Sequence, residues 1–355
     1  MKSAAVLGLA GFVLVLFAIV AAPPAAHAGL NDPQEPGSVL VFPYFRTGTV
    51  ASVESSSHPK TEIEISVTCP AGATCVEGGQ NTGEAVKLRA VWVCPGDAAN
   101  VCAKVPFNLE TTVNGTLYFH PAGTLGELSG ATPVPPPACP RGFLVVWVVD
   151  DTGRPIKYDG LIGNAVIRET TRPAAAYNAV GIQASVLLPV RAPTDRHLGP
   201  GGFNGQLDFN GLEYMPVTGK IFGTVRFPAP SDTSTPPIDD TYLILLTLDA
   251  LAGRPNQATA VGLDVFKMDE SLTLDSVAFV CWTRVLLRDI NPDFNSAIMG
   301  RKGLVESTSA IQGGRAVTLL GLVETVEYAA APDIQRAWVY SLNTGGRPVP
   351  TTFAP

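Results

Sequence analysis

Short apolar segments separated by turn residues constrain this sequence more than any other feature. The chain contains 35 Gly and 31 Pro residues, and many of them stand at the ends of apolar runs rich in β-branched side chains. No long stretch follows the helical period, and strands do not alternate with helices as they do around a parallel sheet. The pattern therefore predicts an all-β protein with very little helix.

Apolar runs with turn residues at both ends predict strands at eleven or more positions. The expected strands are Ser38–Phe42, Glu62–Thr68, Ala85–Val93, Gly142–Val149, Gly181–Val190, Lys220–Phe227, Thr241–Leu248, Val261–Phe266, Ser276–Leu287, Ala316–Val323 and Ala337–Leu342. Residues 62–67 alternate strictly between apolar and polar, as in a half-buried antiparallel strand. Residues 142–149 are almost wholly apolar, which predicts a central strand. So many short strands favour two antiparallel β-sandwich lobes, Ig-like or jelly-roll-like, joined by long loops.

The first 28 residues have the order of a secretory signal peptide. Lys2 is followed by an apolar core at residues 4–22 and by the small-x-small site Ala26-His27-Ala28, so the mature chain is expected to begin at Gly29. An uncleaved membrane anchor is the alternative, although Pro23-Pro24 would break its helix. We expect an exported protein, periplasmic, on the cell surface or extracellular, with no membrane span after cleavage.

Composition changes once more near residue 230. Residues 228–240 read PAPSDTSTPPIDD and have no apolar periodicity, which indicates a linker at 230–239. The expected lobes are then 29–229 and 240–355. The whole chain carries 24 Lys and Arg against 31 Asp and Glu, and this mild acidity argues against nucleic acid and anionic membranes as partners.

An even number of cysteines in an exported chain indicates disulfides. The six are Cys69, Cys75, Cys94, Cys102, Cys139 and Cys281. Sequence does not fix their connectivity. Bridges across the short loops 69–75 and 94–102 are geometrically easy, and Cys139 and Cys281 would then remain for each other. No Cys-x2-Cys or neighbouring His supports zinc, and nothing in the sequence predicts another metal or a cofactor.

The tripeptide Gly-Arg-Pro occurs three times, at 153–155, 253–255 and 346–348. Composition alone would give well under one copy, and the spacing near 100 residues is on the order of one sandwich unit. Each copy follows an apolar strand, so we expect a hairpin turn with Gly at positive φ and Pro beginning the return strand. Two interpretations stay open: internal duplication, or repeated use of one turn chemistry.

The passage from Arg191 to Met215 is the longest polar, Gly-rich part of the chain. It concentrates six side chains that could contact a ligand: Asp195, Arg196, His197, Asp208, Glu213 and Tyr214. Long loops in compact domains are often functional. The alternative is one or two tight Asn-Gly hairpins. The glycine pattern does not match the calcium-binding nonapeptide repeat.

Other chemically suggestive patterns have structural explanations. Asp289 to Asn295 carries oxygen ligands at alternate positions, but a short helix with Asn291 as N-cap, Pro292 at N1 and Gly300 at its end fits better. The pairs Asp150-Asp151 and Asp239-Asp240 are expected at turns rather than in catalysis. The tryptophans at 92, 147, 282 and 338 lie in apolar strands and are expected in the core.

These observations favour an exported binding or structural protein that acts through surface loops, with an unknown ligand. The chain contains no Gly-x-Ser-x-Gly elbow, phosphate-binding loop or dinucleotide motif, so we do not expect an enzyme. Two alternatives remain: a secreted hydrolase whose site is assembled from distant loops, and a subunit of a cell-surface layer or filament that pairs through exposed strand edges.

Overall fold

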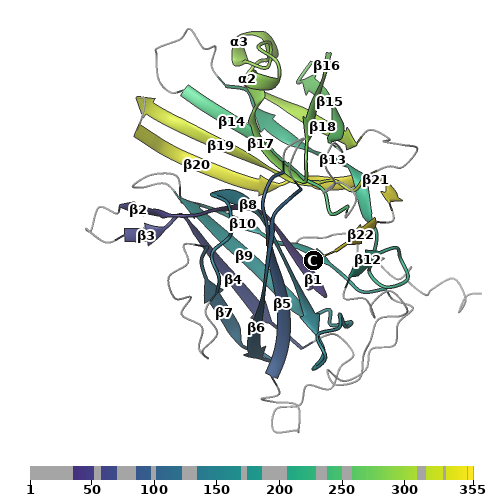
Figure 1. The fold of residues 1–355 in the computed structure, drawn as a ribbon. Helices are drawn as coiled ribbons and strands as arrows, with labels where there is room; N and C mark the ends of the chain where they lie inside the picture. The colour runs from purple at the N-terminus through teal and green to yellow at the C-terminus, as the bar shows by residue number, and fades with distance from the viewer. Residues whose placement is uncertain are drawn as a thin grey trace, which may run out of the picture.

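The computed structural model is almost entirely β-structure, so the predicted all-β class is confirmed (Figure 1). The described residues are 35–51, 57–69, 85–96, 101–121, 134–168, 174–185, 206–228, 238–249, 258–269, 271–309, 317–330, 333–349 and 351–354. Within these ranges no helix is long and apolar enough to cross a membrane. The predicted signal peptide lies outside them.

Strands follow one another along nearly the whole described chain. The earlier ones are β1 (Val39–Arg46), β2 (Thr49–Ala51), β3 (Ser57–Pro59), β4 (Thr61–Val67), β5 (Ala85–Val93), β6 (Lys104–Thr112), β7 (Thr116–Phe119), β8 (Arg141–Val149), β9 (Leu161–Arg168), β10 (Ala174–Asn178), β11 (Val180–Ile182) and β12 (Leu207–Phe209). The later elements are β13 (Val217–Arg226), β14 (Ile238–Leu246), β15 (Thr259–Lys267), β16 (Leu272–Phe279), β17 (Trp282–Leu286), α2 (Leu287–Ile290), α3 (Ser296–Met299), β18 (Lys302–Ser309), β19 (Leu320–Ala330), β20 (Asp333–Ser341), β21 (Asn343–Val349) and β22 (Thr351–Phe353).

These strands form four larger sheets and two ribbons. The larger sheets have the strand orders β11-β1-β8-β5-β6, β10-β9-β4-β7, β16-β15-β18-β13-β21 and β17-β14-β19-β20, and the ribbons are β2-β3 and β12-β22. The local predictions hold well here: β8 is buried along almost its whole length and lies between β1 and β5, and β4 alternates between buried and half-buried residues.

The second part of the chain repeats the strand order of the first. We match β1 with β13, and β4 to β11 in sequence with β14 to β21. The sheet β11-β1-β8-β5-β6 then corresponds to β21-β13-β18-β15-β16, and the sheet β10-β9-β4-β7 corresponds to β20-β19-β14-β17. We call β1–β11 the first copy and β13–β21 the second copy. The repeat begins at β13, which pairs with β18 and β21; β13 therefore joins later strands although it precedes the expected linker at 230–239.

The two copies also share close backbone approaches. Gly142 and Gly303 are the second residues of the matched strands β8 and β18. A Cβ on Gly142 would collide with the carbonyl oxygen of Val93 in β5, and a Cβ on Gly303 with that of Phe266 in β15. Because β5 and β15 are themselves matched, the same backbone contact requires glycine in both copies.

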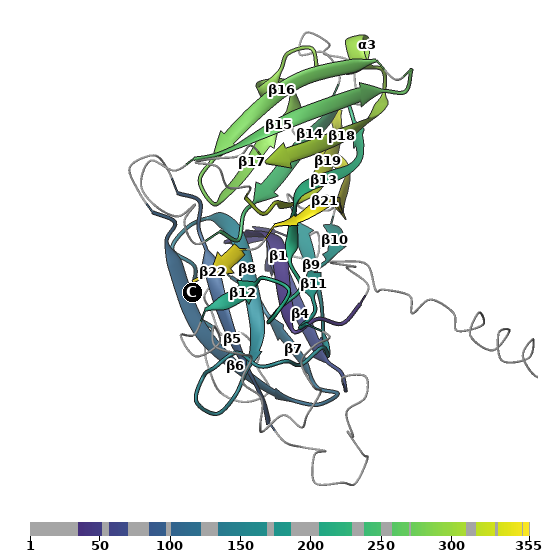
Figure 2. The same cartoon turned by 90° about the vertical axis from the view of Figure 1, so that its right-hand side faces the viewer.

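The sheets do not separate clearly into the two expected sandwich lobes; they form a propeller-like ring of four. The reason lies in the sheet β17-β14-β19-β20 of the second copy, which also packs against the first copy; the first copy lies directly below the second in Figure 2. Along β14, Leu243 and Leu245 pack into the cluster inside the second copy, whereas Ile244 and Leu246 pack into the cluster that fills the first copy. A sheet that is buried on both faces joins the two cores.

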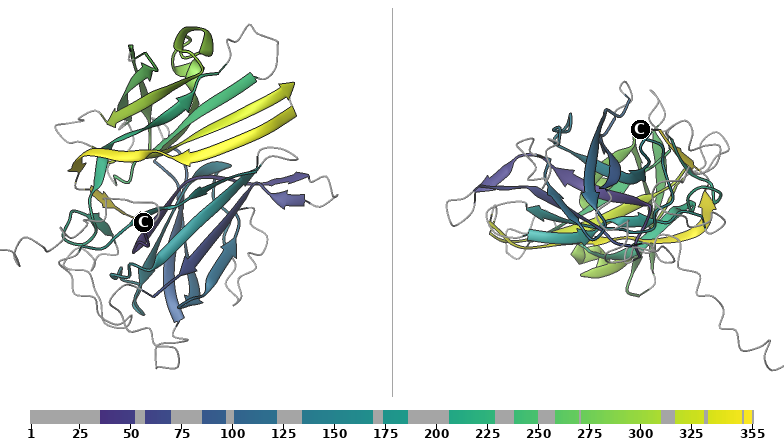
Figure 3. Two further views of the ribbon diagram at one scale, coloured as in Figure 1. Left: turned by 180° about the vertical axis from the view of Figure 1, so that it is seen from behind. Right: turned by 90° about the horizontal axis from the view of Figure 1, so that it is seen from below.

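The end of the chain also returns to the first copy. β22 pairs with β12, and the ring of Phe353 lies 6.3 Å from that of Trp147 in β8. Figure 3 shows β20 running across the first copy, where it contacts β10. The two copies are therefore connected by packing at several places.

The suggested pairings Cys94–Cys102 and Cys139–Cys281 are wrong, and Cys75, the suggested partner of Cys69, lies outside the described residues. Cys94 is bonded to Cys139, and Cys102 to Cys281; Cys69 is also disulfide-bonded. The β5–β6 ladder continues with the Cys94 amide donating to Ala103. Cys102 is therefore one residue out of register with Cys94, and the two side chains point to opposite faces of the hairpin. Cys102–Cys281 instead joins the two copies.

The expected strand 276–287 and the expected helix both needed correction. The strand is interrupted at Cys281, which has a φ of 61°, and β16 and β17 lie in different sheets. The helix α3 begins after Asn295, whose side chain accepts from the amides of Ala297 and Ile298. Asn291 instead forms a turn by accepting from the Asp293 amide. The predicted end at Gly300 is correct.

The first and third Gly-Arg-Pro tripeptides do not mark equivalent places. Gly153 has a φ of 82° and Pro155 pairs with Val149, so the tripeptide at 153–155 is the expected hairpin turn. The tripeptide at 346–348 lies inside the edge strand β21, and the tripeptide at 253–255 lies outside the described residues. The tripeptide therefore does not report the repeat that the strand order shows.

Candidate functional site

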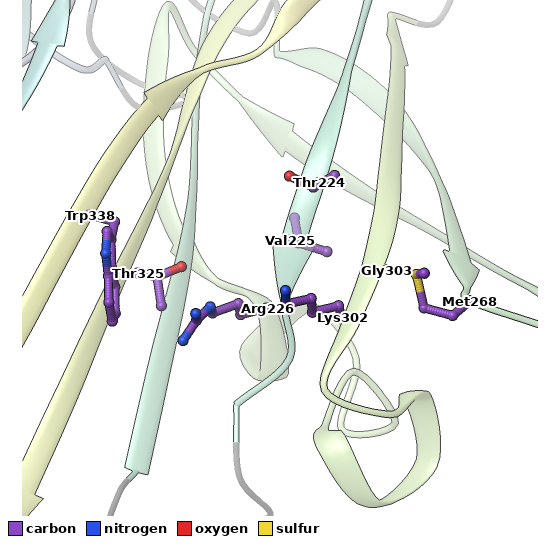
Figure 4. A pocket seen from close by; sticks show the side chains of 8 residues that line it. All are labelled: Thr224, Val225, Arg226, Met268, Lys302, Gly303, Thr325 and Trp338. Atoms are coloured by element: carbon purple, nitrogen blue, oxygen red, sulfur yellow. The ribbon is translucent and has the colours of Figure 1, made fainter.

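A pocket of about 360 Å³ opens between the two large sheets of the second copy. β13 and β18 supply one wall, and β19 and β20 supply the opposite one (Figure 4). Its lining residues are Thr224, Val225, Arg226, Met268, Lys302, Gly303, Thr325 and Trp338. The volume falls in the range of small-molecule sites, about 300–1,000 Å³.

Two cations stand side by side on the first wall. Arg226 of β13 and Lys302 of β18 are directly opposite each other in the antiparallel ladder, so their side chains leave the sheet on one face. Elsewhere on these two strands a cationic side chain does form an ion pair: Lys220 lies 2.5 Å from Glu306. Within the part of the chain that the structure describes, no carboxylate forms an ion pair with Arg226 or Lys302.

An aromatic side chain forms the opposite wall. Trp338 of β20 is half-buried, and the guanidinium of Arg226 lies 4.7 Å from its ring centroid. Its ladder partner Thr325 is buried and shares a hydrogen bond of 3.2 Å with Thr241 of the next strand. This buried contact joins β19 to β14, and β20 pairs with β19 along most of its length, so the Trp338 ring is presented by a rigid sheet.

The remaining lining is mostly small or apolar. Val225 is buried, and Gly303 adds no side chain, because Phe227 and the carbonyl oxygen of Phe266 fill the space where its Cβ would lie. Met268, in the turn after β15, is 79% exposed and forms the outer rim. An unbranched, polarizable side chain at a rim can adapt to ligands of different shape. Positive charge therefore lies beside apolar surface.

None of the described residues that the sequence suggested for binding lines this pocket. Asp195, Arg196 and His197 are outside the described residues. Asp208 of β12 accepts from the Thr352 hydroxyl at 2.6 Å, which ties it to the C-terminal strand.

The turn after β12 is the tight turn that was the alternative interpretation of this passage. Asn210 accepts from the amides of Leu212 and Glu213, and Gly211 has a φ of 82°. Glu213 is 3% exposed and Tyr214 is fully buried, so both side chains face the interior.

Buried polar groups gather beneath this turn. Lys157 donates to the Ser185 carbonyl at 2.9 Å, and burial lowers its pKa. Burial raises the pKa of Asp159, an effect that hydrogen bonds from Ser38 and Ala184 oppose. Desolvation also raises the pKa of Tyr214 well above its usual value. These enclosed groups hold the segment in place, and their hydrogen bonds account for the fold of the turn.

Other sequence candidates have clear positions. Asp150 Oδ1 accepts from the Thr152 and Arg154 amides, which confirms its role in a turn. The turn expected at Asp239-Asp240 is wrong: both residues lie within β14, and Asp240 forms an ion pair with Arg288 of α2 at 2.9 Å. The described residues contain no group of three His, Cys, Asp or Glu close enough to hold a metal ion.

Sequence reasoning missed the pocket. Trp92, Trp147 and Trp282 are buried as predicted, but Trp338 is not, because it lies on the edge strand of its sheet. No sequence motif joins Arg226 and Lys302, since they are far apart in the sequence. One signal was available: each stands at an end of its strand, where a long side chain can reach past the sheet.

Comparisons with known proteins add little. No protein-family model matches the chain, and neither does any curated protein. Among solved structures, the chain is similar to "Crystal Structure of Thermotoga maritima 1070" with a TM-score of 0.27 and 7% identity, over 37% of this chain and 97% of that chain. A TM-score this low supports no conclusion about fold or function.

Proposed function

We propose that this protein is an exported binding protein whose second copy holds a small-molecule site. The observation that carries the proposal is the pocket between β13–β18 and β19–β20, which combines two cations with an aromatic wall on rigid strands. Export is supported by the N-terminal sequence and is compatible with the disulfides. The site lies on strands rather than on the loop 191–215 that the sequence suggested.

We further infer that the matched strand orders reflect an internal duplication, each copy being a sandwich of one five-stranded and one four-stranded sheet. The shared register at Gly142 and Gly303 supports this inference. Duplication gives one chain two versions of the same scaffold. One version can then keep the fold while the other acquires a ligand site.

The test is a thermal-shift screen of organic acids, amines and neutral sugars against the wild type and Trp338→Ala. A ligand at about 100 times its Kd stabilises the native state by about 2.7 kcal/mol. We expect at least one class to raise the Tm of the wild type and to leave that of the variant unchanged. Leu274→Ser, an exposed change on β16, is the control and should keep the response. Hits that survive Trp338→Ala would contradict the proposal.

A second candidate is self-association through an exposed strand edge. β16 ends its sheet, and its Leu272 and Leu274 are 49% and 65% exposed. Edges of this kind can pair with another chain. Sedimentation of the wild type should then show dimers at high concentration, and Leu274→Lys should remove them. A monomer at all concentrations would exclude this candidate. No described contact favours the hydrolase alternative.

A further inference from the structure

We propose that the pocket of the second copy selects anionic amphiphiles: small molecules with one carboxylate, sulfonate or phosphate group and a flat apolar body. This inference rests on the proposed function, because it names the ligand class of the same site. The acid group would lie between Arg226 and Lys302, and the apolar body would lie along Trp338 and Val225. The pocket volume of about 360 Å³ limits the ligand to a small molecule.

The charges of the pocket favour an anion. Like charges directly opposite on antiparallel strands destabilise a sheet, yet Arg226 and Lys302 occupy such a pair. Within the described chain neither one has an ion pair, whereas Arg284 of β17 and Arg288 of α2 each have one. An acid group bound between the two cations would relieve their repulsion and accept charge-assisted hydrogen bonds.

The apolar surface of the pocket favours a flat body beside the acid. Trp338 already carries the Arg226 guanidinium at 4.7 Å from its ring centroid, so a planar group can lie against both. Buried Val225 and exposed Met268 add further apolar lining. An inorganic ion would leave this apolar surface in contact with water, whereas an aromatic acid would cover it and gain the free energy of burying apolar surface.

The first copy supplies an internal comparison. Its strands β1 and β8 bring Arg46 opposite Arg141, in the same register as Arg226 opposite Lys302. Arg46 is only 8% exposed, so in that copy the position is closed. The residue of β10 that corresponds to Trp338 is Ala175, since each pairs with the matched residue of β9 or β19. The cation pair is thus common to both copies, and the aromatic wall belongs to the second copy.

The experiment uses two probes that differ in one acid group: 8-anilinonaphthalene-1-sulfonate and the uncharged N-phenyl-1-naphthylamine. Binding to the full-length mature protein is followed by fluorescence and calorimetry. The variants are Lys302→Gln, Trp338→Ala and the matched control Arg141→Gln, the corresponding position of the first copy. Lys302 is exposed, so its replacement leaves folding intact, which the melting temperature verifies.

We expect one molecule of the sulfonate to bind at least about tenfold more tightly than the neutral amine. Lys302→Gln should weaken sulfonate binding about tenfold, the loss of one charge-assisted contact, and leave amine binding unchanged. Trp338→Ala should weaken both probes, and Arg141→Gln should weaken neither.

Three results would overturn the inference. Equal affinity for both probes, with both lost in Trp338→Ala, would disprove the anionic class while the proposed binding function stands. Equal weakening by Lys302→Gln and Arg141→Gln would show that overall charge, not this pocket, attracts the sulfonate. Sulfonate binding that is absent, or unaffected by Trp338→Ala, would remove the site itself and with it the proposed function.

Discussion

Replacement of Arg284 by methionine is expected to destabilise the whole protein. Nε of Arg284 donates to Oε2 of Glu324 at 2.7 Å, and the two side chains are only 8% and 1% exposed. The guanidinium also lies 3.3 Å from the ring centroid of Tyr242 and 5.9 Å from that of Tyr44 in the first copy. Arg284 therefore contacts both copies at their junction.

The distance and the burial set the magnitude. At 2.7 Å and an effective dielectric constant of about 20, Coulomb's law gives an attraction of about 6 kcal/mol. Desolvation of both charges offsets most of this attraction. Removal of one partner leaves the desolvation cost of the other charge uncompensated and typically destabilises by about 3–5 kcal/mol. With roughly 2–4 °C per kcal/mol, the Tm should fall by on the order of 10 °C.

Urea unfolding followed by circular dichroism provides the measurement. Lys87→Met is the control, because its ion pair with Asp151 has the same length of 2.7 Å but is solvent-exposed, and the midpoint should not move. Arg284→Met combined with Glu324→Leu should recover much of the loss, since no buried charge then lacks its counter-ion. The reasoning is refuted if Arg284→Met costs less than about 1 kcal/mol, or if the double variant loses the sum of the two single losses.

Four further variants test the fold. Gly142→Ala and Gly303→Ala should each destabilise by more than about 1 kcal/mol in urea unfolding, because a Cβ meets a backbone carbonyl in both copies; tolerance at one position would contradict their equivalence. Loss of the Cys102–Cys281 bridge, which closes 179 residues, should lower stability by up to about 5 kcal/mol in calorimetry, and an unchanged Tm would exclude a role in joining the copies. Asp150→Ala should cost about 1–3 kcal/mol, since two turn amides lose their acceptor; a neutral result would mean that solvent replaces it.

Local sequence pattern was enough to place about half of the described strands. The bounds predicted for Ala85–Val93 agree with β5, and the continuous apolar run at 142–149 correctly indicated a central strand. Patterns failed where apolar spacing was weak. β6 contains Pro106 and alternates unevenly, and β10 is mostly alanine, so neither resembled a strand. Pairing with neighbours makes these segments strands, and pairing is not a local property.

Sequence thus determined the class of the fold, the position of its best strands and the chemistry of its turns, because each depends on neighbours along the chain. Tertiary structure decided which strands pair, and with that the disulfide partners, the repeat of strand order and the pocket. Arg226 and Lys302 become neighbours only through the register of β13 and β18, and Trp338 faces them only because two sheets pack. Register is fixed by which faces of the strands are buried together, and that information is distributed over the whole core.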